Sequence, residues 1–167
     1  MAVYTEIRDE DLVAFVAQYD IGEALSATGI VEGVENSNFL LSTTVGNFIL
    51  TIYENRVDPA DLPFFLGLKA HLAAKGIACP IPIQARNGKV LQELSNRPAA
   101  IVTFLGGMWP KSIQPDHCGE LGRALARMHL AGNDFTLQRP NSLSVQSWRP
   151  LLCRCADRAD EVQWALA

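Results

Sequence analysis

The sequence predicts an α+β fold in which an antiparallel sheet with a packed helix is followed by a helical part. Three observations support this class. Two strand-like segments, residues 38–43 and 48–53, flank a short turn of the kind that joins antiparallel strands. Apolar residues recur at helical spacing over residues 58–75 and 115–132. The strand-like segments end at Gly106-Gly107, and the pattern beyond this pair is helical.

The composition is that of a globular protein and disfavours several classes of partner. Of the 167 residues, 49% are hydrophobic and 19% are charged. The net charge of -4, with no Lys/Arg cluster longer than a pair, disfavours a nucleic-acid or membrane-surface partner. No apolar run approaches the ~20 residues that cross a bilayer, and the first residues lack the features of a signal peptide. We therefore expect a cytoplasmic protein.

Neither the cysteines nor the histidines form a recognisable site. The four cysteines are Cys79, Cys118, Cys153 and Cys155. Their scatter indicates reduced thiols rather than a disulfide framework. Cys153 and Cys155 lack further ligands at zinc-site spacing, so no metal site is predicted. His71 and His129 lie on the apolar faces of predicted helices, where a lone histidine is more often structural than catalytic.

The first part of the chain predicts a short helix and three strands. Leu12, Phe15 and Val16 recur at helical spacing within residues 9–18. The strand segments are short and apolar or rich in β-branched and aromatic residues. They are residues 24–31, 38–43 and 48–53.

A long helix is predicted over residues 58–75. Asp58 suits the N-cap, and Pro59 suits the first helical position, where its missing N–H costs nothing. Lys75-Gly76 is a typical helix end. This helix is long enough to pack across the sheet.

A hairpin and a central strand follow. Asn87-Gly88, flanked by residues 83–86 and 90–93, is the strongest short hairpin signal in the chain. Residues 99–105 form a near-continuous apolar run, which predicts a buried central strand.

Two more helices are predicted beyond the Gly-Gly pair. Residues 115–132 carry Leu121, Leu125 and Met128 at helical spacing and end at a glycine. Residues 148–166 predict another helix.

Residues 29–38 join two predicted strands and are the first candidate site. Their two glycines let backbone N–H groups approach an anion, because no Cβ blocks the approach. Asn36, Ser37 and Asn38 can add side-chain donors to phosphate oxygens. The segment is neither a Walker A motif nor G-x-G-x-x-G. From spacing alone, an ordinary hairpin loop remains the simpler interpretation.

Residues 102–105 end the predicted central strand just before the Gly-Gly pair. In a two-lobed nucleotide enzyme, such a strand exit offers backbone groups to an adenine edge between apolar walls. On local evidence, a core strand that ends at a loop remains the simpler interpretation.

Five segments in this order resemble one family. They are Gly-Val-Glu-Asn-Ser-Asn-Phe-Leu-Leu (33–41), Phe-Ile-Leu-Thr-Ile-Tyr-Glu (48–54), Asp-Leu-Pro-Phe-Phe-Leu (61–66), Ala-Ala-Ile-Val-Thr-Phe-Leu-Gly-Gly (99–107) and Leu-Gly-Arg-Ala-Leu-Ala-Arg-Met-His-Leu-Ala-Gly (121–132). Together they resemble homoserine kinase of the aminoglycoside-phosphotransferase, protein-kinase-like type. The first segment is the most specific, and the last is shared by the wider phosphotransferase family.

The resemblance implies a fold, a reaction and a set of binding residues. Residues 1–105 would be a nucleotide-binding N-terminal lobe of about five antiparallel strands, and residues 106–167 a hinge and an incomplete helical lobe. The reaction would be ATP-dependent phosphorylation of L-homoserine to O-phospho-L-homoserine, a step toward threonine. The implied cofactor-binding residues are Gly33, Glu35, Asn36, Ser37, Asn38, Thr51, Thr103, Phe104 and Leu105.

The sequence departs from the family's pattern in two places. Kinases carry a phosphate-pairing lysine on the third strand, and Thr51 occupies that place here, with Arg56 as an alternative cation. The family's H-G-D-x-x-x-x-N catalytic loop and its later metal-binding aspartate do not occur in the 167 residues. The chain is therefore expected to contain no catalytic residue, to be a truncated form, and to be inactive alone, with the Mg²⁺ ligands in the missing segment.

Two alternatives remain open. One is a non-catalytic nucleotide-binding fragment, which the absent catalytic loop favours. The other is a different small-molecule kinase of the same fold, such as an aminoglycoside or choline phosphotransferase, which the segment at 33–41 disfavours. An incomplete lobe would also expose apolar surface, so self-association is expected.

Overall fold

The computed structural model describes residues 4–32, 35–54, 58–108, 110–141 and 144–156. The chain divides into two compact units, Met1–Leu137 and Gln138–Ala167. The first unit contains the sheet and three helices. The predicted division into lobes at residues 105 and 106 stays a prediction, and the compact unit itself continues to Leu137.

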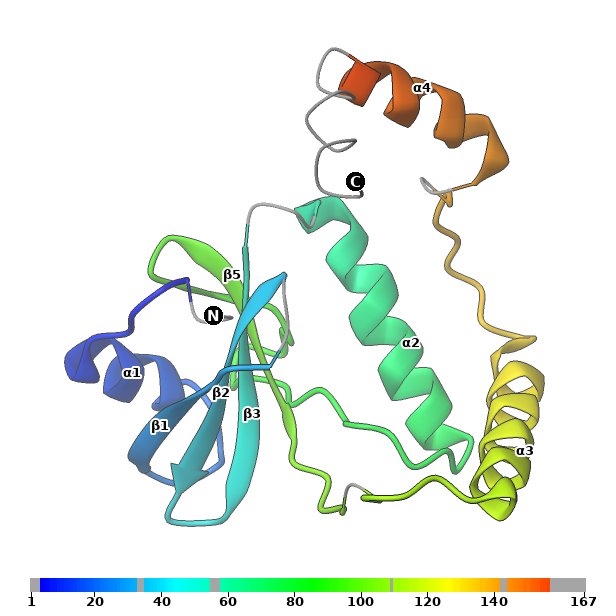
Figure 1. Cartoon of the computed structure of the whole chain (residues 1–167). Helices are drawn as coiled ribbons and strands as arrows, with labels where there is room; N and C mark the ends of the chain where they lie inside the picture. The colour runs from blue at the N-terminus through cyan, green and yellow to red at the C-terminus, as the bar shows by residue number, and fades with distance from the viewer. Residues whose placement is uncertain (1–3, 33–34, 55–57, 109, 142–143, 157–167) are drawn as a thin grey trace. The chain divides into compact units, whose positions relative to one another are not determined.

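The sheet has five strands, and every pairing in it is antiparallel, which confirms the predicted fold class. Its spatial order is β1-β2-β3-β5-β4 (Figure 1). The first three strands form a meander, in which β2 and β3 are the hairpin that their short turn predicts. The strands are β1 (Ala24–Ile30), β2 (Asn36–Thr43), β3 (Asn47–Tyr53), β4 (Gln92–Leu94) and β5 (Arg97–Thr103).

The hydrophobic core lies between one face of this sheet and α1 (Asp9–Val16). Successive side chains of a strand point to opposite faces, so alternate residues of each strand enter the core. The helix contributes the three residues that its periodicity predicted, although it ends at Val16 rather than at residue 18. The core residues of the helix and central strands are Leu12, Phe15, Val16, Phe39, Leu41, Leu50, Ile52, Ala99 and Ile101.

The predicted long helix is present, but Asp58 caps a 3-10 turn that precedes it rather than the α-helix itself. The Asp58 carboxylate accepts a hydrogen bond from Ala60 N at 2.9 Å, and a 3-10 turn, Pro59–Asp61, leads into α2 (Leu62–Ala74). Gly76 follows the helix with a φ of +81°, a conformation that glycine adopts without strain. The helix lies beside the sheet (Figure 1).

The predicted hairpin of residues 83–86 and 90–93 is wrong, although its turn forms. Ala85 N donates to Lys89 O at 2.9 Å across Asn87-Gly88, but the flanking segments do not pair with each other as strands. The first flanking segment, residues 83–86, lies against β5 instead, as shown by the hydrogen bond from Ile83 N to Ile101 O at 2.9 Å.

The hairpin of this region joins β4 to β5 through Ser95 and Asn96. Their φ angles are +53° and +59°, the left-handed pair that a two-residue hairpin turn requires. The central strand that was predicted over residues 99–105 accordingly begins at Arg97 and ends at Thr103.

The helix α3 (Pro115–Gly132) has the predicted bounds. The segment after it is fastened to α2 within the first unit. Lys75 Nζ lies 2.6 Å from Asp134 Oδ2, and His71 Nε2 lies 2.9 Å from the Ala131 carbonyl oxygen and 3.0 Å from Asp134 Oδ1. The Phe135 ring packs edge-on against Phe64, with centroids 5.6 Å apart.

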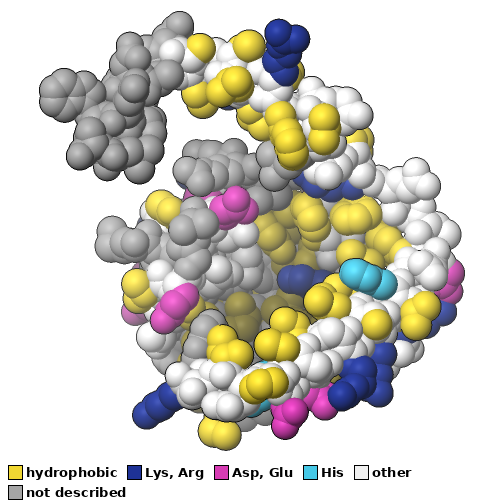
Figure 2. Space-filling view, turned by 45° about the vertical axis from the view of Figure 1, so that its right-hand side comes forward, with side chains coloured by type: hydrophobic (Ala, Val, Ile, Leu, Met, Phe, Trp, Pro, Cys, Tyr) yellow, Lys and Arg dark blue, Asp and Glu magenta, His cyan; other side chains and the backbone are white. Residues whose placement is uncertain are grey.

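Large apolar side chains remain exposed on α3. Leu121 is 61% exposed, and Leu130 is 71% exposed. Figure 2 turns the right-hand side of Figure 1 forward and shows hydrophobic side chains at this surface.

The second unit contains α4 (Val145–Cys155), which begins before the first residue of the predicted helix of residues 148–166. The part of that prediction beyond residue 156 lies outside the described residues. Among the helices of the described part, none is long and apolar enough to cross a membrane.

Candidate functional site

The sheet face opposite α1 brings several predicted site residues together. The register places Asn38 of β2 beside Thr51 of β3, and Thr51 beside Ala100 of β5. Ile30 of β1 continues this row on the other side of Asn38. The row is therefore polar at its centre and apolar at both ends.

The next row on the same face begins with Thr28 of β1, is apolar from β2 to β5, and lies nearer to the end of β5. Leu40 pairs with Ile49, and Ile49 pairs with Val102. Leu40 and Ile49 are half-buried, and Val102 is buried. Because β5 ends one residue after Val102, this apolar row borders the strand exit, whereas the polar row borders the connection between β1 and β2.

The polar row is held by hydrogen bonds of its side chains to one another and to the backbone. Thr51 Oγ1 lies 2.8 Å from Asn38 Oδ1, and Asn38 Nδ2 lies 3.5 Å from the carbonyl oxygen of Asn36. The Asn36 side chain accepts from Glu54 N at 3.4 Å. The structure thus joins Asn36, Asn38 and Thr51 in one network, with exposed Glu35 next to it in the chain. Gly33, which was predicted to cover the phosphates, lies outside the described residues.

The Ser37 hydroxyl is not part of this network. Ser37 is fully buried, and its hydroxyl accepts from the backbone N of Tyr4 at 2.8 Å and of Thr5 at 3.1 Å. It donates to Glu54 Oε1 at 2.7 Å. The reason is the alternation of a β-strand, which turns Ser37 to the opposite face from Asn36 and Asn38. Its hydroxyl therefore fastens the N-terminal segment to the sheet.

Glu54 is a structural residue that the sequence did not identify. Its Oε1 accepts from Ser37 and, at 2.7 Å, from Thr5 Oγ1. Its Oε2 lies 3.0 Å from Arg97 NH1, so this buried carboxylate is paired with a cation. The sequence carries a weak signal for it, because a lone carboxylate follows an apolar strand directly.

The predicted hinge residues lie at the exit of β5. Thr103 is engaged with the neighbouring segment, since its N donates to Ile81 O and its Oγ1 accepts from Ile81 N, both at 2.9 Å. Phe104 and Leu105 follow, and their side chains are about half exposed. Within the described residues, no hydrogen bond engages the backbone of Phe104 or Leu105, so these groups are available to a ligand.

Ionisable groups on and near α2 are affected by burial. Burial lowers the pKa of Lys69, an effect that the nearby Cys79 thiol partly offsets. Burial also raises the pKa of Tyr53 on β3. Arg56, the predicted alternative cation, lies outside the described residues. The described part of the chain holds no group of three or more His, Cys, Asp or Glu side chains arranged for a metal ion.

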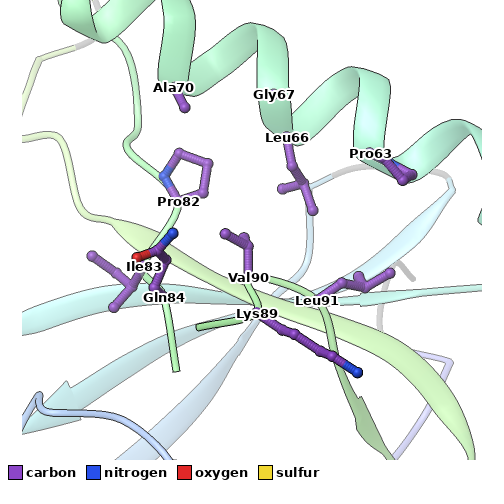
Figure 3. Close-up of a pocket in the computed structure, with 10 residues that line it drawn as sticks. All are labelled: Pro63, Leu66, Gly67, Ala70, Pro82, Ile83, Gln84, Lys89, Val90 and Leu91. Carbon is purple, nitrogen blue, oxygen red and sulfur yellow. The ribbon is translucent and has the colours of Figure 1, made fainter. Parts of the chain in front are cut away.

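A cavity of about 760 Å³ lies between α2 and residues 82–91 (Figure 3). Leu66 of α2 faces Val90 across it, and Gln84 and Lys89 supply its polar groups. No residue of the two rows lines this cavity. The cavity is therefore separate from the candidate face.

Solved structures support the fold. The chain is similar to a spectinomycin phosphotransferase in complex with ADP and spectinomycin, with a TM-score of 0.66 and 16% identity over 92% of this chain and 48% of that one. It is also similar to a microcompartment-associated aminopropanol kinase, with a TM-score of 0.64 and 20% identity over 90% of this chain and 55% of that one. The fold is thus that of the protein-kinase-like phosphotransferases.

Curated relatives at much higher identity are homoserine kinases. The chain is 59% identical to the homoserine kinase of Bradyrhizobium diazoefficiens over 98% of its length and 50% of the relative. It is 60% identical to that of Rhodospirillum rubrum over 98% of its length and 51% of the relative. The chain spans about half the length of the curated relatives it matches. The profile of the phosphotransferase enzyme family matches residues 26–167. The chain belongs to the phosphotransferase enzyme family.

Proposed function

We propose that this chain is the nucleotide-binding part of an ATP-dependent homoserine kinase, which transfers a phosphoryl group to the hydroxyl of L-homoserine. The observation that carries the proposal is the identity of about 59% to homoserine kinases along nearly the whole chain. The relatives' name supplies the substrate. Their common chemistry would consume ATP and release ADP and O-phospho-L-homoserine.

The candidate face fits a nucleotide in its two rows. The apolar row of Leu40, Ile49 and Val102 suits an adenine ring, and the free backbone groups of Phe104 and Leu105 beside it suit the polar edge of that ring. The neighbouring polar row suits phosphate oxygens, because asparagine amides donate hydrogen bonds. Bound ATP would supply the phosphoryl group, while the residues of this chain bind and orient it.

We further propose that the 167-residue chain has no turnover by itself. Phosphoryl transfer needs a residue that positions the acceptor hydroxyl and ligands that hold Mg²⁺. The H-G-D-x-x-x-x-N segment that supplies the base in this family is absent from the sequence. ATP binding by the chain should accordingly be weak, and Mg²⁺ binding should depend on residues that these 167 do not include.

The test joins this chain to the part of the Rhodospirillum rubrum homoserine kinase that it does not span, since the two match over 51% of the relative. Coupled ADP release is measured with L-homoserine, choline and an aminoglycoside as acceptors. We expect turnover of about 1–100 per second with homoserine and none from the unextended chain. Preference for choline or the aminoglycoside would overturn the substrate assignment, and turnover by the unextended chain would overturn its proposed inactivity.

The exposed apolar side chains of α3 lead us to propose self-association of the 167-residue chain. Leu121 and Leu125 lie one helical turn apart on this helix and are both solvent-exposed, and soluble monomers rarely expose large apolar patches. Sedimentation velocity over a range of concentrations should show association, which a Leu121→Lys, Leu125→Lys variant should reduce. A stable monomer at all concentrations would contradict this part of the proposal.

A further inference from the structure

The hydrogen bond between Thr51 and Asn38 lies where the sheet departs from other kinases. A kinase places its phosphate-pairing lysine on the third strand, and the resemblance puts Thr51 at that place. Thr51 cannot supply a positive charge. Its hydroxyl instead contacts the side chain of Asn38, its partner across the β2–β3 ladder, at 2.8 Å.

The surroundings of Asn38 determine which way its amide faces. The carbonyl oxygen of Asn36 can only accept hydrogen bonds, so the amide atom 3.5 Å from it must be the NH₂ nitrogen. The amide oxygen of Asn38 then faces Thr51, and the Thr51 hydroxyl must donate to it. One N–H of the Asn38 amide points toward Asn36, and the other has no acceptor among the described residues.

This remaining N–H belongs to the face that suits a nucleotide. Asn38 and Thr51 are both half-buried, so the amide is within reach of a ligand but has a fixed environment. Ile30 and Ala100 flank the pair in its row and offer no competing side-chain acceptor. The nearest buried carboxylate, Glu54, engages Ser37, Thr5 and Arg97 instead.

We propose that Asn38 donates its free amide N–H to a phosphate oxygen of the nucleotide, and that Thr51 is the positioning residue that keeps this donor outward. The inference rests on the proposed function. It places the uncharged pair of Asn38 and Thr51 where other kinases have their phosphate-pairing lysine. If Thr51 did not hold the amide oxygen, the amide could flip and present that oxygen to the phosphate. The pair therefore contributes to the binding of phosphate and not to the binding of adenine.

The structure offers a matched control in the same hairpin. Ser42 Oγ lies 2.9 Å from Asn47 Oδ1, and these residues also pair across β2 and β3. This second hydroxyl–asparagine bond lies at the opposite end of the ladder from Asn38 and Thr51. Ser42→Ala therefore removes the same kind of bond from the same sheet without touching the polar row.

The experiment titrates the full 167-residue chain with ATP and, separately, with adenosine, following the ¹⁵N side-chain amide resonances. In the unmodified chain, ATP should shift the Asn38 amide resonance, and adenosine should not. Thr51→Val should weaken ATP binding about five- to tenfold, the effect of one hydrogen bond, and leave adenosine binding unchanged. Thr51→Ser should restore ATP binding, and Ser42→Ala should not alter it.

Asn38→Asp provides a second variant of nearly the same shape. One oxygen of its carboxylate still accepts a hydrogen bond from Thr51, but the other oxygen faces the phosphate, where an N–H donor stood. ATP binding should therefore fall more than tenfold. Failure of the unmodified chain to bind ATP would overturn the proposed function and this inference together. ATP binding that resists both Thr51→Val and Asn38→Asp would overturn the inference alone, as would an equal loss of adenosine binding.

Discussion

Glu54 and Arg97 form an ion pair that joins the end of β3 to the start of β5, with Glu54 Oε2 3.0 Å from the Arg97 guanidinium. Glu54 is 9% exposed and also accepts hydrogen bonds from Ser37 and Thr5. One carboxylate thus connects three strands of the sheet and the N-terminal segment.

Replacement of Glu54 by alanine should destabilise the chain by about 3 kcal/mol, because a partly buried cation and two hydroxyls each lose one partner. Urea unfolding followed by circular dichroism measures the change. Glu93→Ala is the control, since Glu93 is an exposed carboxylate on β4, and it should cost less than about 0.5 kcal/mol. Equal effects of the two substitutions would contradict the central role of Glu54.

Replacement of Ser37 by alanine should lower the free energy of unfolding by about 1–3 kcal/mol, the range for leaving buried groups without their partner. The backbone N–H groups of Tyr4 and Thr5 lose an acceptor in this variant. ATP binding should persist, because the hydroxyl faces away from the polar row. The result that would count against this interpretation is loss of ATP binding at unchanged stability, measured by urea unfolding and by NMR titration.

Gly22 and Gly76 separate the cost of backbone conformation from the cost of a steric clash. Their φ angles are nearly equal, +79° and +81°, so an alanine at either site adopts the same unfavourable conformation. A Cβ at Gly22 would also overlap the Thr44 side chain, whereas a Cβ at Gly76 meets nothing within 4 Å. We expect Gly76→Ala to cost about 1 kcal/mol and Gly22→Ala to cost clearly more. Thermal unfolding of both variants tests this order, which equal losses would refute.

Asp134 should titrate below its ordinary pKa of 3.8, mainly because Lys75 donates a hydrogen bond to its carboxylate. A carboxylate with a lowered pKa stabilises the folded state above its ordinary pKa, and this contribution is lost as the pH falls through the lowered value. The link between α2 and the segment after α3 should therefore weaken only in acid. An NMR titration should show the pKa of Asp134 rising in Lys75→Met, and an unchanged value would contradict the pairing.

Helix caps, apolar periodicity and short turns correctly predicted the elements whose ends are determined by interactions between residues close in the sequence. Asp58 and Pro59 determine a helix start through a cap and a fixed φ, and both act in the 3-10 turn that precedes α2. The bounds of α3 followed from apolar periodicity and its final glycine. The hairpin of β2 and β3 followed from the short turn between two strand-like segments. In each case the decisive interactions join residues that are close in the sequence.

Non-local pairing decided what the sequence could not predict. Asn87-Gly88 has the stronger hairpin signal, yet the segment before it pairs with β5, and the turn between strands falls to Ser95 and Asn96. The strand was predicted to begin at residue 38, because residues 36 and 37 are small and polar, but β2 includes them through pairing with Tyr53 and Ile52. That extension turns Ser37 inward and Asn38 outward. Composition alone could not separate their roles.

The contacts of Phe135 bear on where this fold can be cut. Phe135 packs against Phe64, and its ring lies 5.3 Å from that of His71, so the residues after α3 complete the surface of α2. A fragment designed to end at residue 105 would expose that surface of α2 to solvent. It would also lack Asp134, the ion-pair partner of Lys75. A fragment ending at Leu137 keeps both, and we expect it to be the smallest part of the chain that can be expressed as an independent folding unit.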